Sequence, residues 1–471
     1  FNMNILFVSG ERKPFAKTGG LADVVFSLSK EMVKKGNEVS VCIPLYKSIK
    51  DSNSDLKKIS SFKVKMNWRM QDVDVYETIR NGVKFYFIGC AVYFNREHLY
   101  SYEDDIERFA LFDLATVEFV KKHLTNLDIV HVHDWQAGMV PLLLKVNKIK
   151  VKTVLTIHNP MFQGNFSPDY IMDYFNLPRS FYDEGTMRFN NYCSFLKTAI
   201  VTTDVVTTVS VTHAKELRED KTSYNGLGNI IALRGNRFVG IVNGIDEDEF
   251  NPTTDKYIAK KYDIYSFKES KKENLVQLQK RFEYTRIPKG PVVGVVTRLT
   301  PQKGIIDIIK SIPLLVTYDM QVFIVGEGDR DLENELQKQA EKYPNHIKFY
   351  KGYSDELAHI VYAASDFFLM PSVFEPCGIG QLVAMRYGTL PIVRRVGGLN
   401  DTVTGYELDK DRATGFSFDK DNDEGLQESI KLAYECYKKE NMVKIILNAM
   451  KFDSSWSKSV DNYLSLYKDI I

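Results

Sequence analysis

Short apolar segments alternate along this chain with longer amphipathic ones, and this alternation most limits the folds that the chain can adopt. Segments rich in β-branched and aromatic residues predict strands, and a helical apolar period between them predicts helices. Strands that alternate with helices form parallel sheets covered by helices. We therefore predict an α/β fold of two doubly wound, Rossmann-like domains. The predicted strands are residues 5–8, 39–43, 129–133, 153–158, 205–209 and 238–242, then 292–296, 321–325, 347–350, 367–370 and 390–393.

The alternation is interrupted between residues 246 and 290, which are polar, rich in lysine and without strand signals. The chain has 471 residues, more than a single hydrophobic core accommodates, so more than one domain is expected. We predict an N-terminal domain over residues 1–246, a linker over 247–290 and a C-terminal domain over 291–450. Ligands of such domains bind beyond the carboxyl ends of the strands, and two domains facing each other would enclose a cleft.

Charge and cysteine content disfavour several classes of function. Lys and Arg number 62 and Asp and Glu 61, so the net charge of +1 provides no general attraction to nucleic acid or to an anionic membrane. No apolar run reaches the roughly 18 residues of a membrane span. The five cysteines are far apart and form no C-x-x-C pair, which disfavours a zinc site or a disulfide framework and fits a reducing compartment.

The first motif, Lys17-Thr18-Gly19-Gly20-Leu21-Ala22-Asp23, joins a predicted strand to a predicted helix. Its two glycines would let the backbone approach a ligand, and the start of the helix would offer free N–H groups to an anion. Lys17 would add a positive charge at the same place. The alternative interpretation is a strand–helix turn whose glycines serve packing. The motif is neither G-x-G-x-x-G nor a P-loop, so it gives no support to a dinucleotide or P-loop site.

Two histidine motifs follow predicted strands of the first domain. In His131-Val132-His133-Asp134-Trp135, His133 could donate to or polarise a sugar hydroxyl, whereas a structural role is favoured for His131. For His133 and Asp134 a structural interpretation stays open. The second motif, with His158-Asn159, carries imidazole and amide groups that suit a neutral polyhydroxyl ligand, or it is loop structure.

The second domain carries two further motifs. Arg298-Leu299-Thr300-Pro301-Gln302-Lys303-Gly304 places two cations at a helix start, which favours a pyrophosphate site over a solvated basic turn. In Phe374-Glu375-Pro376-Cys377-Gly378-Ile379-Gly380 a carboxylate precedes a glycine-rich loop. Glu375 could face a developing positive charge, or it could serve as an acid at a helix start. Cys377 is predicted to pack rather than to act as a nucleophile. Gly397-Gly398 is predicted to be a turn.

The order of these motifs is more specific than any one of them. It closely resembles the bacterial glycogen synthase and plant starch synthase family, and the likeness continues through Thr208-Val209-Ser210, Asn243-Gly244-Ile245-Asp246 and Ala413-Thr414-Gly415-Phe416. The resemblance implies a GT-B fold with an acceptor-side N-terminal domain and a donor-side C-terminal domain. It also implies a closing helix over residues 451–471 that packs back on the N-terminal domain.

The same resemblance implies an activity and its site. Glucose would pass, with retention of configuration, from a nucleotide-diphosphate glucose, usually ADP-glucose, to the non-reducing end of an α-1,4-glucan, with no cofactor and no required metal. Glu375, His133, Arg298 and Lys303 would be catalytic, with Tyr353 stacking on adenine. The implied donor site is Lys17, Gly20, Asn243, Arg298, Lys303, Tyr353, Glu375, Cys377, Gly378, Ile379 and Gly380, and the implied acceptor site is Asp23, Tyr100, His158 and Asn159.

Some departures and alternatives stay open. The family often has threonine where this chain has Gly380, which removes one hydroxyl contact to phosphate. A non-catalytic glucan-binding or initiation relative is one alternative, and a sucrose or trehalose-phosphate type of transferase is another. The sequence leaves UDP-glucose against ADP-glucose, oligomeric state and regulation undecided. The resemblance implies the bacterial cytoplasm or the plastid stroma as the location.

Overall fold

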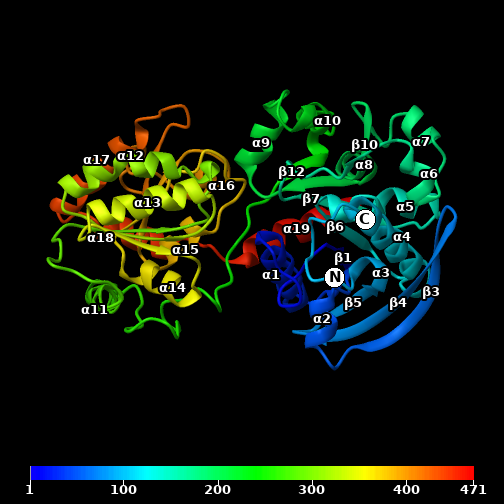
Figure 1. Ribbon diagram of the computed structural model, residues 1–471, viewed down its shortest axis with the longest axis horizontal. Coiled ribbons are helices and arrows are strands. Elements are labelled where there is room, and N and C mark those ends of the chain that lie inside the picture. The colour runs from blue at the N-terminus through cyan, green and yellow to red at the C-terminus, as the bar shows by residue number, and fades with distance from the viewer. Residues whose placement is uncertain (1) are drawn as a thin grey trace. The chain divides into compact units, whose positions relative to one another are not determined.

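The computed structural model of this chain describes residues 2–471 and divides into two compact units (Figure 1). The first unit runs to Val209 and adds Ala214–Ile241 and Trp456–Ile471. The second comprises Ser210–His213 and Val242–Ser455, so it contains the segment 247–290 that the sequence predicts to be a linker. Among residues 2–471, none of the helices combines the length and the apolar character that crossing a membrane would require.

The first unit is built on a nine-stranded sheet in the order β12-β11-β7-β6-β1-β2-β5-β4-β3. The strands from β12 to β5 are parallel, and β4 and β3 extend the sheet in antiparallel fashion. A three-stranded antiparallel sheet, β8-β10-β9, accompanies it. The strands are β1 (Asn4–Val8), β2 (Glu38–Pro44), β3 (Lys57–Met66), β4 (Arg69–Arg80), β5 (Val83–Gly89), β6 (Ile129–His133), β7 (Lys152–Ile157), β8 (Asn165–Phe166), β9 (Arg188–Phe189), β10 (Tyr192–Ser194), β11 (Val205–Thr208) and β12 (Phe238–Gly240).

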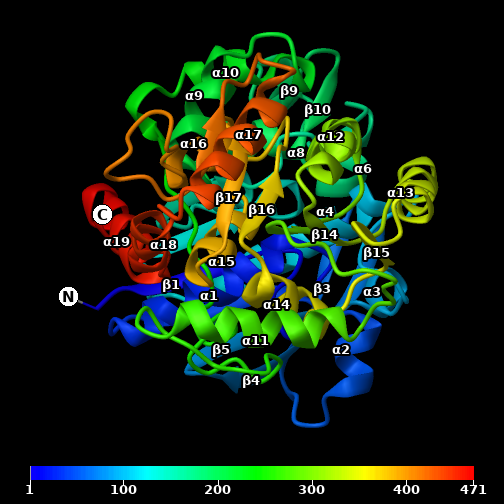
Figure 2. The ribbon, with the colours of Figure 1, turned by 90° about the vertical axis from the view of Figure 1, so that its left-hand side faces the viewer.

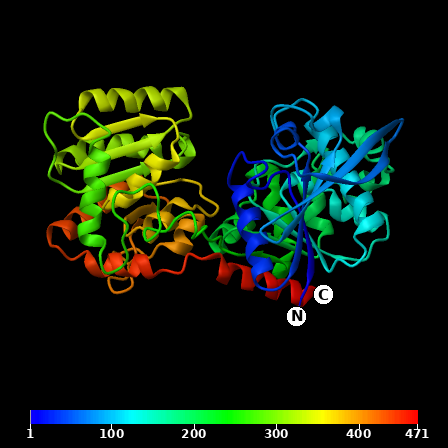
Figure 3. The ribbon, with the colours of Figure 1, turned by 90° about the horizontal axis from the view of Figure 1, so that it is seen from below.

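The helices that accompany the larger sheet include the last helix of the chain. Helix α19 lies beside α1 and belongs to the first unit, and Lys35, which follows α1, forms an ion pair with Asp461 (Figure 3). The helices are α1 (Gly20–Lys34), α2 (Lys47–Ser52), α3 (Ala91–Phe94), α4 (Asp105–His123), α5 (Val140–Val146), α6 (Tyr170–Phe175), α7 (Ser180–Asp183), α8 (Phe195–Thr202), α9 (Val211–Glu219), α10 (Leu227–Ala232) and α19 (Trp456–Ile470).

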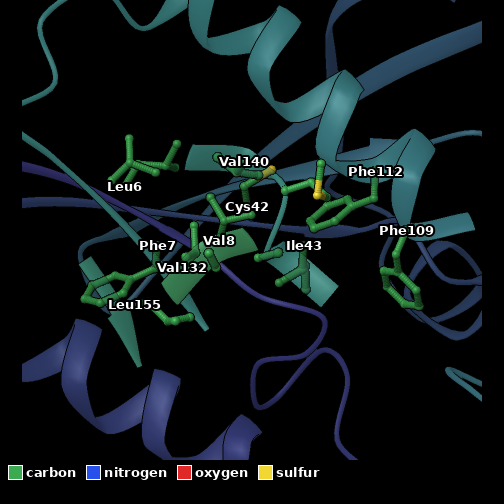
Figure 4. Close-up of a cluster of buried hydrophobic side chains, with 14 of the residues drawn as sticks. Leu6, Phe7, Val8, Cys42, Ile43, Phe109, Phe112, Val132, Val140 and Leu155 are labelled. Atoms are coloured by element: carbon green, nitrogen blue, oxygen red, sulfur yellow. The ribbon is translucent and has the colours of Figure 1, made fainter. Parts of the chain in front are cut away.

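The sequence analysis did not predict the antiparallel strands β3 and β4. Parallel strands buried on both faces read as continuous apolar runs, and β1 contributes such a run through Leu6, Phe7 and Val8 (Figure 4). Along β3, buried side chains alternate with exposed ones from Phe62 to Met66, because only one face of this strand is covered. The sequence signal for a strand is therefore weaker in β3 than in the continuously apolar strands at the centre of the sheet.

The second unit contains a six-stranded parallel sheet in the order β15-β14-β13-β16-β17-β18. Helices α11 and α14 lie on one face of this sheet and α12 lies on the other (Figure 2). Alternate side chains of β13 and β14 serve the two faces: Val292 and Phe323 pack with α11 and α14, and Val293 and Ile324 pack with α12. The strands are β13 (Val292–Val296), β14 (Gln321–Gly326), β15 (Ile347–Lys351), β16 (Phe367–Met370), β17 (Leu390–Arg394) and β18 (Phe416–Phe418), and the helices are α11 (Phe267–Gln279), α12 (Ile305–Thr317), α13 (Arg330–Lys342), α14 (Asp355–Ala364), α15 (Gly380–Arg386), α16 (Gly397–Thr402), α17 (Gly425–Lys438) and α18 (Val443–Lys451).

The order of strands reverses once in each large sheet, and this reversal positions the candidate site. In the first unit the chain builds β2 on one side of β1 and later β6 on the other. In the second unit β14 and β16 flank β13 in the same manner. Ligands of doubly wound sheets bind beyond the carboxyl ends of the strands at such a reversal. The loops after β1 and β6, and those after β13 and β16, are therefore the places to look for function.

Candidate active site

In the second unit, a carboxylate and a lysine meet at the carboxyl ends of β13 and β16. The Nζ atom of Lys303 lies 2.8 Å from Oε2 of Glu375, and the hydroxyl of Ser372 donates to the same oxygen at 3.0 Å. Glu375 is only 8% exposed. Its other oxygen, Oε1, makes no hydrogen bond with any part of the chain that the structure describes. The site thus holds a carboxylate firmly by one oxygen and leaves the other available to a ligand.

Close backbone packing brings these two groups together. The N–H of Val373 donates to the carbonyl of Gln302 at 2.9 Å, which joins the two loops directly. Gly304 has a φ of 72°, and a Cβ atom there would lie 2.3 Å from the carbonyl oxygen of Pro371. Only glycine permits this approach, because it has no Cβ and adopts positive φ readily. The glycine that ends the basic motif therefore positions Lys303 opposite Glu375.

The glycine pair Gly397-Gly398 supports the same carboxylate loop, a function that the sequence analysis missed when it predicted a turn. The N–H of Gly398 donates to the carbonyls of Glu375 and Pro376 at 3.1 and 3.0 Å. A Cβ on Gly397 would lie 1.8 Å from the carbonyl oxygen of Glu375, and one on Gly398 would lie 2.0 Å from that of Cys377. The signal in the sequence was a second glycine pair after a strand, but its contact partner is apparent only in three dimensions.

Arg298 and Tyr353 lie at the same edge of the second sheet. The side chain of Arg298 is exposed and forms no ion pair within residues 2–471. Tyr353 is 63% exposed, and its hydroxyl donates to Asp355 at 2.7 Å. The strands that precede them, β13 and β15, are separated by β14, which corresponds to about 10 Å at the usual strand spacing. A cation and an aromatic ring at this separation suit the phosphates and the base of a nucleotide.

The remaining donor-site residues of the second unit surround the carboxylate loop. Burial raises the pKa of the Cys377 thiol to about 12, so a thiolate nucleophile is disfavoured. Oδ1 of Asn243 is buried without a partner among residues 2–471. Ile379 is exposed. A Cβ on Gly380 would lie 3.2 Å from the ring of Phe368, so a threonine there would crowd this ring.

In the first unit, Lys17 and Asp23 form an ion pair with a separation of 2.8 Å, so the structure brings together a predicted donor residue and a predicted acceptor residue. A Cβ on Gly19 or on Gly20 would meet no atom within 4 Å. The interpretation that these glycines serve packing is therefore wrong. They leave open space beside the backbone, as a ligand contact would require.

The loop before α1 is bonded internally. The N–H groups of Thr18 and Gly19 donate to the carboxylate of Glu11 at 2.8 and 3.3 Å. The N–H groups of the first turn of α1, from Gly20 to Ala22, are not involved, so the anion site expected at the helix start stays a prediction. The hydroxyl of Tyr100, a predicted acceptor residue, also donates to Glu11 at 2.9 Å. Glu11 was missed by the sequence analysis because a glutamate six residues before a short motif carries no signal of its own.

The histidines form a buried column at the ends of β6 and β7. Nδ1 of His133 lies 3.0 Å from Nε2 of His158, and the ring of His131 stacks on His133 with a centroid distance of 4.4 Å. Burial lowers the pKa of His158 to about 3 and that of His133 well below its ordinary value, so both are neutral at pH 7. Nε2 of His133 has no partner in the described chain. This nitrogen is therefore a buried polar atom whose hydrogen-bonding capacity is unused within the described chain.

Two of the other motif residues have structural partners. His131 is bonded to the hydroxyls of Tyr467 and Thr156 at 2.5 and 2.6 Å, in agreement with its predicted structural role. Asp134 accepts the N–H groups of His158 and Asn159 at 2.7 and 3.4 Å, and burial raises its pKa to about 7. Asp134 thus supports the His-Asn loop.

The described residues contain no group of three or more His, Cys, Asp or Glu side chains placed to hold a metal ion. The second unit has Lys303 paired with Glu375, whose Oε1 has no partner in the described chain, and an exposed Arg298 in the same loop as Lys303. Such a set can bind an anionic leaving group and can stabilise positive charge on a neighbouring carbon.

Comparison with known proteins agrees with this architecture. Residues 4–232 match the family model of the starch synthase catalytic domain, and residues 276–450 match that of glycosyl transferases group 1. The glycogen synthase of Clostridium beijerinckii is 40% identical over 99% of both chains, and that of Caldicellulosiruptor saccharolyticus is 41% identical over 100% of both.

Solved structures are similar over the full length as well. The catalytic domain of starch synthase IV from Arabidopsis thaliana, bound to ADP and acarbose, has a TM-score of 0.89 and 29% identity, covering 100% of this chain and 99% of that one. Sucrose-phosphate synthase from Thermosynechococcus elongatus has a TM-score of 0.60 and 16% identity, covering 99% of both chains, and this similarity concerns the fold alone.

Proposed function

The chain belongs to the glycogen and starch synthase family of glucosyltransferases, and from that premise we propose its substrates and the roles of its residues. The donor is ADP-glucose, the acceptor is the non-reducing end of an α-1,4-glucan, and the α configuration is retained. The observation that supports this most is the arrangement at the reversal of the second sheet, where Lys303 holds Glu375 and leaves Oε1 of the carboxylate free.

The diphosphate of the donor binds to Arg298 and Lys303. As the bond between glucose and diphosphate breaks, negative charge grows on the departing phosphate and positive charge grows on the sugar. Preorganised cations stabilise the first, and a preorganised carboxylate stabilises the second. Lys303 serves both, because it holds Glu375 in place and is itself adjacent to the leaving group. Gly378, with a φ of 75°, presents its backbone beside the carboxylate.

The base of the nucleotide stacks on the exposed ring of Tyr353, about 10 Å from the strand that leads to Arg298. Stacking on a tyrosine accepts any base, so this ring does not select adenine by itself. The proposal of ADP-glucose rests on the family, and the similar starch synthase IV structure is described as bound to ADP.

The first unit contacts sugar. Gly20 offers open space at its backbone, Lys17 offers an ammonium group, and Nε2 of His133 has no hydrogen-bond partner in the described chain. Asp23 and His158 are proposed to contact the acceptor. For Tyr100 and Asn159 an indirect role is better supported, because the Tyr100 hydroxyl is bonded to Glu11 and Oδ1 of Asn159 accepts the N–H of Met161.

We further propose that transfer needs no added metal, since Arg298 and Lys303 provide the charge that a cation would supply to the diphosphate. Activity that persists after treatment with EDTA would support this. The five cysteines are buried and free, which is typical of a reducing compartment such as the cytoplasm.

The first test is elongation. The purified protein is incubated with ADP-glucose or UDP-glucose and a short maltooligosaccharide, and the released nucleotide and the lengthened glucan are measured. Elongation with ADP-glucose alone is expected. Elongation with UDP-glucose alone would overturn the donor, and ADP binding without elongation by either donor would favour a non-catalytic relative.

A further inference from the structure

Glu11 is a buried carboxylate at the centre of the first unit's glycine loop. Its Oε2 accepts the N–H groups of Thr18 and Gly19, at 2.8 and 3.3 Å, and its Oε1 accepts the hydroxyls of Thr18 and Tyr100, both at 2.9 Å. The residue is 3% exposed, and no Lys, Arg or His of residues 2–471 forms an ion pair with it. It is held by hydrogen bonds alone.

The number of these bonds decides what Glu11 can do. A carboxylate has about four lone-pair sites, and all four are used here. Glu11 therefore has no site left for a sugar hydroxyl or for a proton in transit. Glu375 is different, because its Oε2 accepts from Lys303 and Ser372 while Oε1 has no partner in the described chain. The two glutamates thus have different functions: Glu375 can contact a ligand, whereas Glu11 contacts only the protein.

Neighbouring residues are arranged to permit this geometry. A Cβ on Gly10 would lie 2.7 Å from the hydroxyl oxygen of Tyr100, so the absence of a side chain lets that hydroxyl reach Glu11. The carbonyl of Gly10 accepts the hydroxyl of Tyr46 at 2.6 Å, and the hydroxyl of Ser9 donates to the carbonyl of Glu11 at 2.8 Å. The backbone that carries Glu11 is therefore anchored on both sides.

We propose that Glu11 is a positioning residue for glucosyl transfer, an inference that rests on the proposed function. It holds the peptide groups of Thr18 and Gly19, which lie between Lys17 and Gly20 in the sequence. When the middle of the loop is held in place, so are the two residues that flank it. The ammonium group of Lys17 and the uncovered backbone of Gly20 then stay in the positions that the sugar requires. Misplacing a positioning element by about 1 Å costs roughly 100-fold in rate even when the reacting groups are untouched.

The decisive variant is Glu11→Gln. Glutamine has the same shape but is neutral and has one acceptor oxygen instead of two. If that oxygen accepts the N–H groups of Thr18 and Gly19, these bonds lose their charge assistance, and the NH₂ group must face the hydroxyls of Thr18 and Tyr100, which now donate to a carboxylate. We expect kcat to fall roughly 10- to 100-fold. The Kd for ADP should change less than about threefold, because the proposed nucleotide contacts lie in the other unit. Hydrogen exchange should accelerate at the amides of Thr18 and Gly19, and not in the strands of the sheet.

Asp113→Asn is the matched control. Asp113 is also a buried carboxylate of the first unit, but it accepts the N–H of Met139 and makes no contact with the loop. Burial raises its pKa well above the ordinary range, which favours the neutral carboxyl, and asparagine is neutral as well. This variant should keep both the wild-type kcat and the wild-type exchange at Thr18 and Gly19.

Three results would overturn the role of Glu11. They are wild-type kcat in Glu11→Gln, unchanged exchange at Thr18 and Gly19, and a loss of kcat matched by faster exchange throughout the sheet, which would indicate general destabilisation. These outcomes are separable from failure of the proposed function. If the wild-type protein itself does not elongate a glucan with either donor, the proposed function fails, and with it any role of Glu11 in transfer.

Discussion

Lys303 and Glu375 are 72 positions apart, and Nζ of the lysine lies 2.8 Å from Oε2 of the carboxylate. The pair is largely buried, with the lysine side chain 19% exposed and the glutamate 8%. Burial makes such a pair costly to break, because each charge would be left without its partner. The lysine therefore keeps the carboxylate oriented, and in the proposed function the sugar contacts the Oε1 atom, which has no partner in the described chain.

Replacing Glu375 by glutamine should remove most of the turnover and leave donor binding intact. The neutral amide cannot stabilise positive charge on glucose, and losses of roughly 10²–10³-fold in kcat are usual when such a group is removed. Single-turnover kinetics with ADP-glucose would measure the loss, and calorimetry would measure ADP binding. Ser372→Ala is the control, because it removes only one bond to the other oxygen. Near-normal turnover of Glu375→Gln would show that this carboxylate is not catalytic.

Arg298→Ala should weaken the binding of ADP as well as turnover. The guanidinium is exposed and has no ion-pair partner within residues 2–471, so its removal leaves no buried charge behind and the fold should be unaffected. We expect the Kd for ADP to rise roughly tenfold at low salt and less at high salt, because screening weakens exposed charges. Arg412→Ala, at another exposed arginine, should change neither quantity. Equal Kd values for Arg298→Ala and wild type would exclude a diphosphate contact.

The buried histidines predict a loss of stability in acid. Because the pKa of His158 in the folded state, about 3, is below its ordinary value of 6.5, the unfolded chain binds more protons between these values. Stability therefore falls as the pH drops below 6.5, by up to about 1.4 kcal/mol per pH unit for this group. Asp134 has the opposite effect on stability. Its pKa is raised from 3.8 to about 7, so between these values the folded chain binds more protons, and this group stabilises the fold as the pH falls.

Urea unfolding from pH 7 to pH 5 in wild type and in His158→Asn isolates this effect, since Asp134 is common to both. The wild type should lose stability more steeply than the variant as the pH falls. Parallel slopes would mean that His158 titrates normally in the folded state.

Two glycine substitutions should affect different properties: Gly398→Ala should lower stability, and Gly19→Ala should lower activity. A Cβ at Gly398 would lie 2.0 Å from the Cys377 carbonyl oxygen, so Gly398→Ala should destabilise the second unit by about 1–3 kcal/mol. A Cβ at Gly19 would meet nothing within 4 Å, and its φ of −163° suits any residue. Gly19→Ala should therefore keep the wild-type melting temperature and lose activity. A stable Gly398→Ala variant, or full activity in Gly19→Ala, would contradict these assignments.

Much of the fold could be predicted from local pattern. The parallel strands β1, β6, β13 and β16 read as apolar runs, and a motif directly after such a strand must lie at the carboxyl edge of its sheet. The positions of Arg298 and Glu375 in adjacent loops follow from this rule. The packing of α11 into the second unit and the antiparallel strands β3 and β4 were not predicted, because polar or half-exposed segments carry a weak apolar period.

The two doubly wound α/β domains, the order of the motifs and their placement at the ends of strands were predictable from local sequence, since hydrophobic periodicity acts over neighbouring residues. The partner of each polar group was not, because it depends on how distant segments pack. Glu11 accepts the N–H groups of Thr18 and Gly19, and Gly398 supports the Glu375 loop. Hydrogen bonds depend on distances below about 3.5 Å. Between residues remote in sequence, such distances are set only when the whole sheet and its helices have packed.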